Sequence, residues 1–119
     1  MKKIAFGLAV AAALAPLAVS AAEQDFTLIN RTGYQIDEVY VAKPSSSSWG
    51  NDIMGDGVLE NGAKKVIHFK PTTTACDWQI AVKFSDGSNV EWDAFDLCTI
   101  HTITLKYNKN SGETTAVAE

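Results

Sequence analysis

The chain has 119 residues and carries 14 acidic against 10 basic side chains, a formal net charge of −4 at pH 7. Without Lys2 and Lys3, which belong to the N-terminal leader described next, the net charge becomes −6. An acidic surface of this kind argues against nucleic acid and anionic membranes as partners. The length is that of one domain with a modest core.

The first 21 residues have the composition of a secretory signal peptide of bacterial type. A basic start is followed by an apolar run, rich in Ala and Leu, over residues 4–19. Small residues then predict cleavage after Ala21 or, alternatively, after Ala22. A transmembrane helix is the other interpretation, but the run is short for a span and contains Pro16. We therefore expect a periplasmic or secreted domain that keeps no membrane contact after cleavage.

Three strands are predicted in the first half of the mature chain. Residues 25–30 form the first, a turn at 30–33 follows, and residues 34–42 form the second. After a long connection, residues 63–70 form the third strand, in which Ile67 and Phe69 share one face.

The connection over residues 43–59 has neither helical nor strand periodicity. It begins with Pro44 and four serines at 45–48, which add nothing to a core. Its length and its apolar residues predict a structured loop, and such loops often carry binding residues. We expect any interaction surface to lie at 45–57, with the candidate residues Trp49, Asp52, Ile53, Met54 and Asp56. The alternative is that Trp49 and Ile53 fold back to cover one end of the sandwich.

Residues 76–98 read as a β-hairpin closed by a disulfide. Apolar and polar residues alternate along residues 78–84, and Asp86-Gly87 is a strong turn signal. If Cys76 faces Cys98, the apolar residues fall on one face, and a longer loop or a bulge is needed near the tip. The pairs expected from this register are Phe84 with Val90, Val82 with Trp92, and Ile80 with Ala94. Two cysteines in an exported chain predict one disulfide.

Residues 99–107 form the last predicted strand, and the polar residues 109–119 are expected to be a flexible tail. No segment has a convincing helical pattern. About six or more strands separated by turn signals predict an all-β fold, a small antiparallel β-sandwich over residues 22–108 with one disulfide.

No catalytic motif or cofactor signature is found, and we assign no metal site. His68 and His101 are the only histidines, and a surface or packing role is the simpler interpretation of both. Asp52, Asp56 and Glu60 offer oxygen ligands near two glycines, but the spacing is not that of a known Ca²⁺ loop. The sequence leaves Ca²⁺ binding by this loop open.

Much of the mature chain resembles a family of small exported bacterial β-domain proteins. The resemblance rests on an Asn-x-Thr-Gly turn at 30–33, an Ile-x-x-Val-Tyr-Val strand at 36–41, the serines at 45–48, Trp-Gly-Asn-Asp at 49–52, Leu-x-x-Gly at 59–62 and Cys-x-Trp at 76–78. These motifs are structural and imply no chemistry. Some similar short proteins carry the name argininosuccinate lyase. That enzyme is long and mostly helical, and its signature loop is not found in this sequence.

Two classes of function follow from the sequence. The favoured one is a non-enzymatic exported domain that binds an envelope protein or a small ligand. The alternative is a small hydrolase or metal-dependent enzyme that uses His68 or His101.

Overall fold

The computed structural model describes residues 22–119, which form seven β-strands and no helix. The strands are β1 (Phe26–Asn30), β2 (Ile36–Ala42), β3 (Lys64–Ile67), β4 (Asp77–Phe84), β5 (Asn89–Asp96), β6 (Thr102–Asn108) and β7 (Glu113–Ala118). The predicted signal peptide, residues 1–21, lies outside the described residues. In residues 22–119 there is accordingly no helix with the length and apolar character needed to cross a membrane.

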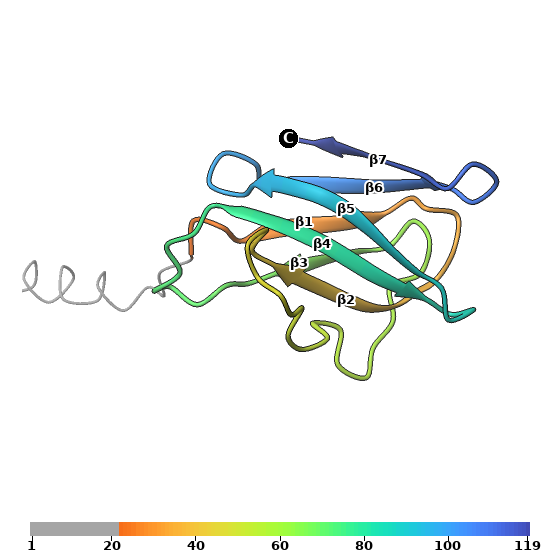
Figure 1. Ribbon diagram of the computed structural model, residues 1–119, viewed down its shortest axis with the longest axis horizontal. Coiled ribbons are helices and arrows are strands. Elements are labelled where there is room, and N and C mark those ends of the chain that lie inside the picture. Colours follow the sequence, from red (N-terminus) through yellow and green to blue (C-terminus); the bar gives the residue numbers. More distant parts are fainter. Residues whose placement is uncertain (1–21) are drawn as a thin grey trace, which may run out of the picture.

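The strands form two sheets that pack face to face, as Figure 1 shows. One sheet has the order β3-β1-β6-β7 and the other the order β2-β4-β5. The predicted all-β sandwich with one disulfide is therefore confirmed. One pairing differs from the expected antiparallel pattern, because β1 and β6 run parallel, with Leu28 opposite Ile103. Two strands so far apart in the chain leave no local signal of their relative direction.

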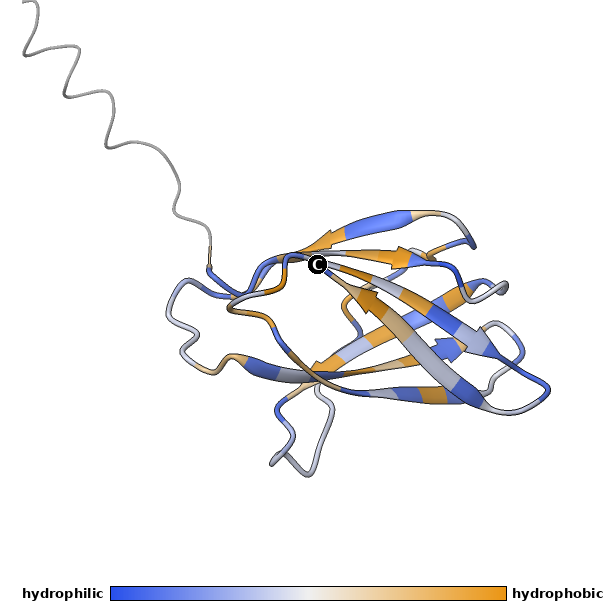
Figure 2. Ribbon diagram, turned by 90° about the horizontal axis from the view of Figure 1, so that it is seen from above, coloured by the Kyte–Doolittle hydropathy of each residue, from blue (hydrophilic) through white to orange (hydrophobic). Residues whose placement is uncertain are grey.

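The core lies between the two sheets and is built from the inward-facing residues of each. Leu28, Ile103 and Leu105 of one sheet and Val39 and Ile80 of the other have no exposed surface. Along the strands, hydrophobic and hydrophilic residues alternate, as Figure 2 shows. This alternation buries one face of each sheet and leaves the other face available for contacts outside the core.

The β4–β5 hairpin keeps the predicted inward face but in a register that differs from the expected one. Val82 pairs with Val90 and Ile80 with Trp92, whereas we expected Val82 opposite Trp92 and Phe84 opposite Val90. The shift is two residues, and a strand repeats its facing every two residues. The apolar side chains therefore still point into the core, and Trp92 is only 4% exposed.

The expected longer loop is present at the tip of this hairpin. The N–H of Phe84 donates to the carbonyl oxygen of Ser88, which leaves a three-residue loop at 85–87. Gly87 has φ +91°, which glycine adopts without strain.

A register irregularity lies further along, between Trp78 and Ile80 on β4. One prediction is wrong here: Ala94, which we expected on the core face, is exposed. A bulge inserts one residue on one strand and so turns that strand's side chains locally.

The predicted disulfide is confirmed. Cys76 and Cys98 are bonded, with their Cα atoms 5.2 Å apart, and the described residues contain no free cysteine. The bond joins the ends of β4 and β5, where the N–H of Leu97 also donates to the carbonyl oxygen of Cys76. A structural disulfide is typical of proteins in an oxidising, extracytoplasmic environment.

The prediction of a flexible tail over 109–119 is wrong for most of that segment. Residues 113–118 form β7, which pairs antiparallel with β6 from Ile103↔Ala118 to Asn108↔Glu113. The indole Nε1–H of Trp92 on β5 also donates to the carbonyl oxygen of Thr115, at 2.9 Å. The polar composition gave no strand signal. The strand is held by its main-chain pairing with β6, and its own side chains are mostly exposed.

Candidate functional site

The described residues form a hollow on the outer face of the β2-β4-β5 sheet. Tyr40, Ala81 and Glu91 lie in one row across the three strands, because Tyr40 pairs with Ala81 and Ala81 with Glu91. Their neighbours Val39 and Val82 point into the core, so the row faces outward. A methyl group between two longer side chains leaves a depression in the middle of the row.

Trp49, from the predicted recognition loop, completes this hollow. The hollow has a volume of about 330 Å³ and is lined by Tyr40, Trp49, Ala81, Val82, Asn89 and Glu91. Trp49 itself is half-buried, and Asn89 and Glu91 are exposed. The site thus combines two aromatic rings with a carboxylate and an amide, and we call it the Trp49 hollow.

The loop that carries Trp49 is attached to the edge of β2. The carboxylate of Asp52 accepts hydrogen bonds through Oδ1 from the N–H groups of Val39 and Met54, each at 2.9 Å. The N–H of Ile53 donates to the carbonyl oxygen of Val39, at 2.8 Å. Asp52 therefore bonds to its own turn, as its residue type favours, and it also fastens the loop to the sheet.

Apart from Asp52, the candidate interaction residues divide into two groups. Ile53 and Met54 are partly buried and pack against the core. Trp49 lines the hollow instead, and Asp56 is exposed. The first group anchors the loop, and the second group presents side chains to the outside. The sequence placed all of them on one surface and did not separate these roles.

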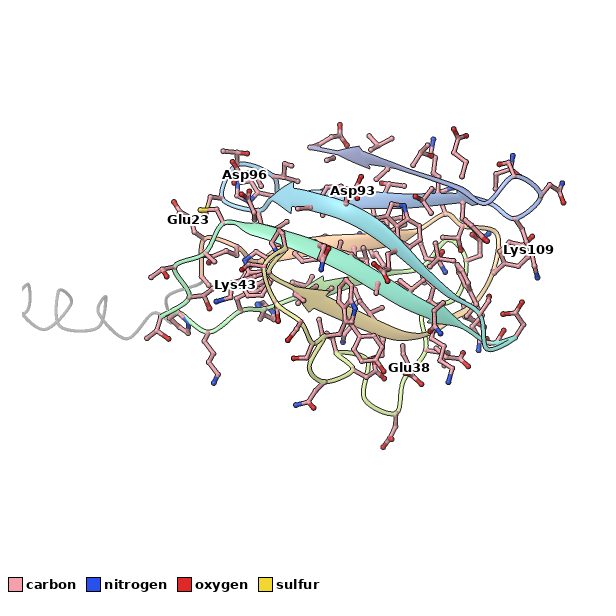
Figure 3. The ribbon with its side chains drawn as sticks, viewed as in Figure 1. Glu23, Glu38, Lys43, Asp93, Asp96 and Lys109 are labelled. Carbon is pink, nitrogen blue, oxygen red and sulfur yellow. A yellow bond between two sulfur atoms is a disulfide. The ribbon has the colours of Figure 1, made fainter. Side chains whose placement is uncertain are left out.

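A polar cluster borders the hollow along β2. The phenol of Tyr40 donates to Oε1 of Glu38, while Nζ of Lys83 lies 3.8 Å from Oε2 of the same carboxylate. The hydrogen bond to Glu38, together with desolvation, raises the pKa of Tyr40 to about 12. Tyr40 therefore stays protonated at any physiological pH and offers a neutral ring to the hollow. Figure 3 labels Glu38 on this side of the molecule.

Sequence reasoning did not find Tyr40, Asn89 or Glu91 as site residues. The only signal was their outward position on patterned strands, which most strand residues share. Their common location follows from cross-strand register, which could be predicted from the sequence only to within two residues.

The two histidines lie at strand ends and not within strands. His68 follows β3, and its Nδ1 is 3.1 Å from Oδ2 of Asp25, with 73% of the imidazole side chain exposed. The other oxygen of Asp25 accepts the N–H of Phe69 at 2.7 Å. Burial opposes the charged form of Asp25, but these two hydrogen bonds lower its pKa below the usual value. The pair holds the segment after β3 against the start of β1.

His101 precedes β6 and is exposed. Its N–H donates to the carbonyl oxygen of Glu119 at 2.7 Å, and its carbonyl oxygen accepts the N–H of Thr27 at 2.9 Å. These two main-chain hydrogen bonds align the start of β6 with the end of the chain after β7 and with β1.

Within residues 22–119, only one group of potential metal ligands converges, namely Cys76, Asp96 and Cys98. The two sulfur atoms are bonded to each other, so neither is a thiolate that could hold a metal. The loop carboxylates of Asp52, Asp56 and Glu60 do not form such a group in the described part of the chain.

A second cluster, at the end of the sandwich where three chain turns meet, was not expected from the sequence. It contains the rings of Tyr34, Phe84 and Tyr107 and the ion pair of Lys109 with Asp86. Lys109 lies in the segment predicted to be a flexible tail, and a flexible tail predicts no fixed contact for it.

Comparison with known proteins gives no further assignment: no protein-family model, curated protein or solved structure matches the chain.

Proposed function

We propose that this protein is an exported, non-enzymatic binding domain, periplasmic or secreted, that holds a small polar ring, such as one sugar unit, in the Trp49 hollow. The observation that carries the proposal is a single hollow lined by Trp49 and Tyr40 together with the small side chain of Ala81 and the polar groups of Glu91 and Asn89. The disulfide and the predicted signal peptide support the location.

The chemistry of the lining favours this class of ligand. An indole and a phenol ring present flat apolar faces to the C–H groups of a ring. A carboxylate and an amide nearby can accept and donate hydrogen bonds to hydroxyl groups. The volume of about 330 Å³ lies at the lower end of the range of roughly 300–1,000 Å³ typical of small-ligand sites. The hollow is therefore suited to a small ligand such as one sugar ring.

The attachment of the loop also supports binding. Because Asp52 and Ile53 fix the loop to Val39, Trp49 is held near its position before a ligand arrives. A site formed in advance loses less conformational entropy on binding.

The test is a titration of the oxidised protein with glucose, galactose, N-acetylglucosamine and their β-linked disaccharides, followed by calorimetry. We expect at least one sugar to bind, and Trp49→Ala to weaken that binding by about tenfold or more. Glu91→Gln should also weaken it, whereas Asp93→Asn, a matched change on the same strand, should not. No binding of any of these sugars would overturn the ligand class. Unchanged binding by Trp49→Ala would overturn the site.

A further inference from the structure

Three turns that are distant from one another in the sequence meet at one end of the sandwich. Tyr34 follows β1, Phe84 ends β4, Tyr107 lies near the end of β6, and Lys109 begins the β6–β7 turn. Figure 3 labels Lys109 at this end, beside the β4–β5 and β6–β7 turns. The Trp49 hollow lies elsewhere, on the outer face of β2-β4-β5, so the two sites share no lining residue.

The three aromatic rings form a continuous cluster. The rings of Phe84 and Tyr107 are stacked, with centroids 5.5 Å apart. Tyr34 meets both of them edge-on, at 5.8 Å from Phe84 and 6.4 Å from Tyr107. Tyr34 is 40% exposed, so one aromatic wall of the cluster is accessible from outside.

A cation already occupies this aromatic cluster. Nζ of Lys109 lies 5.2 Å from the centroid of the Tyr34 ring. The same nitrogen lies 2.9 Å from Oδ2 of Asp86. A ring face together with a carboxylate is the combination that recognises ammonium groups.

The carboxylate of Asp86 is fixed and stays charged. Its Oδ1 accepts hydrogen bonds from the N–H and the hydroxyl of Ser88, at 2.9 and 2.6 Å. The hydroxyl of Ser88 and then the ammonium of Lys109 hold the pKa of Asp86 well below its usual value. The negative charge therefore persists when Lys109 moves away, because the Ser88 contacts remain.

There is space beside the lysine for another group. One pocket of about 120 Å³ is lined by Tyr34, Phe84, Ser85, Asp86, Ser88, Tyr107 and Lys109. A second, more open one of about 360 Å³ is lined by Tyr34, Tyr107, Lys109 and residues of the two adjoining turns. Lys109 lines both pockets, and its side chain is 52% exposed. An exposed lysine in an ion pair of this kind is held only weakly.

We propose that this end of the sandwich is a binding site for a small alkylammonium group, whose cation takes the place that Nζ of Lys109 holds in this structure. Tyr34 and Asp86 recognise the cation, while Phe84 and Tyr107 contact its methyl groups. Lys109 is a tethered competitor that keeps the site closed to weak ligands. The net charge of −6 for the chain without its leader lysines favours the approach of a cation.

The test compares wild type with Lys109→Met, which removes the competing ammonium and keeps a side chain of similar length. Tetramethylammonium and choline are titrated, and the ring protons of Tyr34 and Tyr107 are followed by NMR. We expect Lys109→Met to bind either cation about tenfold more tightly than wild type. Lys106→Met, a matched change on the outer face of β6, should bind like wild type.

Two further measurements establish the chemistry. Asp86→Asn and Tyr34→Leu, each combined with Lys109→Met, should abolish binding. The neutral isostere 3,3-dimethyl-1-butanol should bind far more weakly than choline. A folded Lys109→Met protein that binds choline no more tightly than wild type would overturn the proposal, and so would equal binding of choline and the neutral isostere.

The source of the ammonium group is separated by one more comparison. Sedimentation of Lys109→Met with phosphatidylcholine vesicles, but not of the variant that also has Asp86→Asn, would identify a lipid headgroup. Choline binding without sedimentation would identify a free small molecule. Both results support the site, and sedimentation that is independent of Asp86 contradicts it.

Discussion

The indole Nε1–H of Trp92 donates to the main-chain carbonyl oxygen of Thr115, at 2.9 Å. Trp92 is on β5 and Thr115 on β7. Each is an edge strand of its sheet, so this bond joins the two sheets at their edges. It makes the C-terminal strand part of the sandwich, because the last strand pairs with β6 on one side and is bonded to the buried tryptophan on the other.

Removal of β7 should therefore unfold or strongly destabilise the domain. A chain that stops after Ser111 loses the β6–β7 pairing and leaves the indole N–H of Trp92 without its acceptor. We expect a loss of more than about 2 kcal/mol in the free energy of unfolding, measured by urea titration. Trp92→Phe, which removes only the N–H and part of the ring, should cost less than the truncation. A truncated chain as stable as the full one would show that β7 is dispensable.

Trp92→Ala should cost more stability than Trp49→Ala. Trp92 is 4% exposed in the core, and its truncation should cost about 3–5 kcal/mol. Trp49 lines a surface hollow, and its truncation should cost about 1 kcal/mol or less. Urea melts of the two variants give the order. A reversed order would favour the alternative in which Trp49 covers one end of the sandwich.

Asp52→Ala should release the loop that carries Trp49. The change removes the acceptor of the Val39 and Met54 N–H groups. We expect faster hydrogen exchange at both amides and a loss of about 1 kcal/mol in stability. Asp56→Ala, an exposed change in the same loop, is the control and should leave both amides as protected as in wild type. Unchanged protection in Asp52→Ala would mean that other contacts hold the loop.

The charged carboxylate of Asp25 should stabilise the fold, and this stabilisation should be lost at low pH. Its pKa is lowered in the folded protein, so its contribution is complete above the unfolded value of about 3.9 and disappears as pH falls through the folded value. Asp25→Asn should thus be less stable than wild type at pH 6, by about 1 kcal/mol. The stabilities of the two proteins should converge as the pH falls below the unfolded value of about 3.9 and through the lower folded pKa of Asp25. A difference that does not shrink on acidification would contradict this account, and Asp93→Asn serves as the exposed control.

Loss of the disulfide should lower stability without changing the fold of the sandwich. Cys76 and Cys98 are separated by 22 positions, and closing a loop of that length stabilises by about 3 kcal/mol in the chain-entropy model. The double change Cys76→Ala and Cys98→Ala tests this by urea melts. Intact mass after alkylation checks the bond itself, since two alkylated thiols in protein that has not been reduced would disprove it.

The parts of the fold that could be predicted are those with local patterns. The β4–β5 hairpin was identified from the alternation along residues 78–84 and the Asp86-Gly87 turn, and its disulfide from the two cysteines. Ala94 was misplaced because it lies in a β5 bulge, where Asp93 and Ala94 stand opposite Gln79 alone, and this bulge has no sequence signature. The polar strand β7 and the parallel pairing of β1 with β6 depend on partners far away in the chain, which a local pattern does not contain.

The site could be predicted only in part for the same reason. The length and composition of residues 45–57 pointed to the loop and to Trp49. The partners of Trp49 in the hollow come from three strands and depend on register. The end cluster brings Lys109 and the nearby Tyr107 together with Tyr34 and Phe84 from two other turns, and a lysine in a polar tail gave no indication of that contact.

The most direct test of the Trp49 hollow uses the three tryptophan indole N–H signals in a ¹H–¹⁵N NMR spectrum. Two of them are internal references, because Nε1 of Trp78 donates to Ala75 and Nε1 of Trp92 donates to Thr115. Titration with the sugars named above should shift the Trp49 signal and leave these two in place. A ligand that shifts the Trp92 or Trp78 signal while the Trp49 signal stays unchanged would contradict the account.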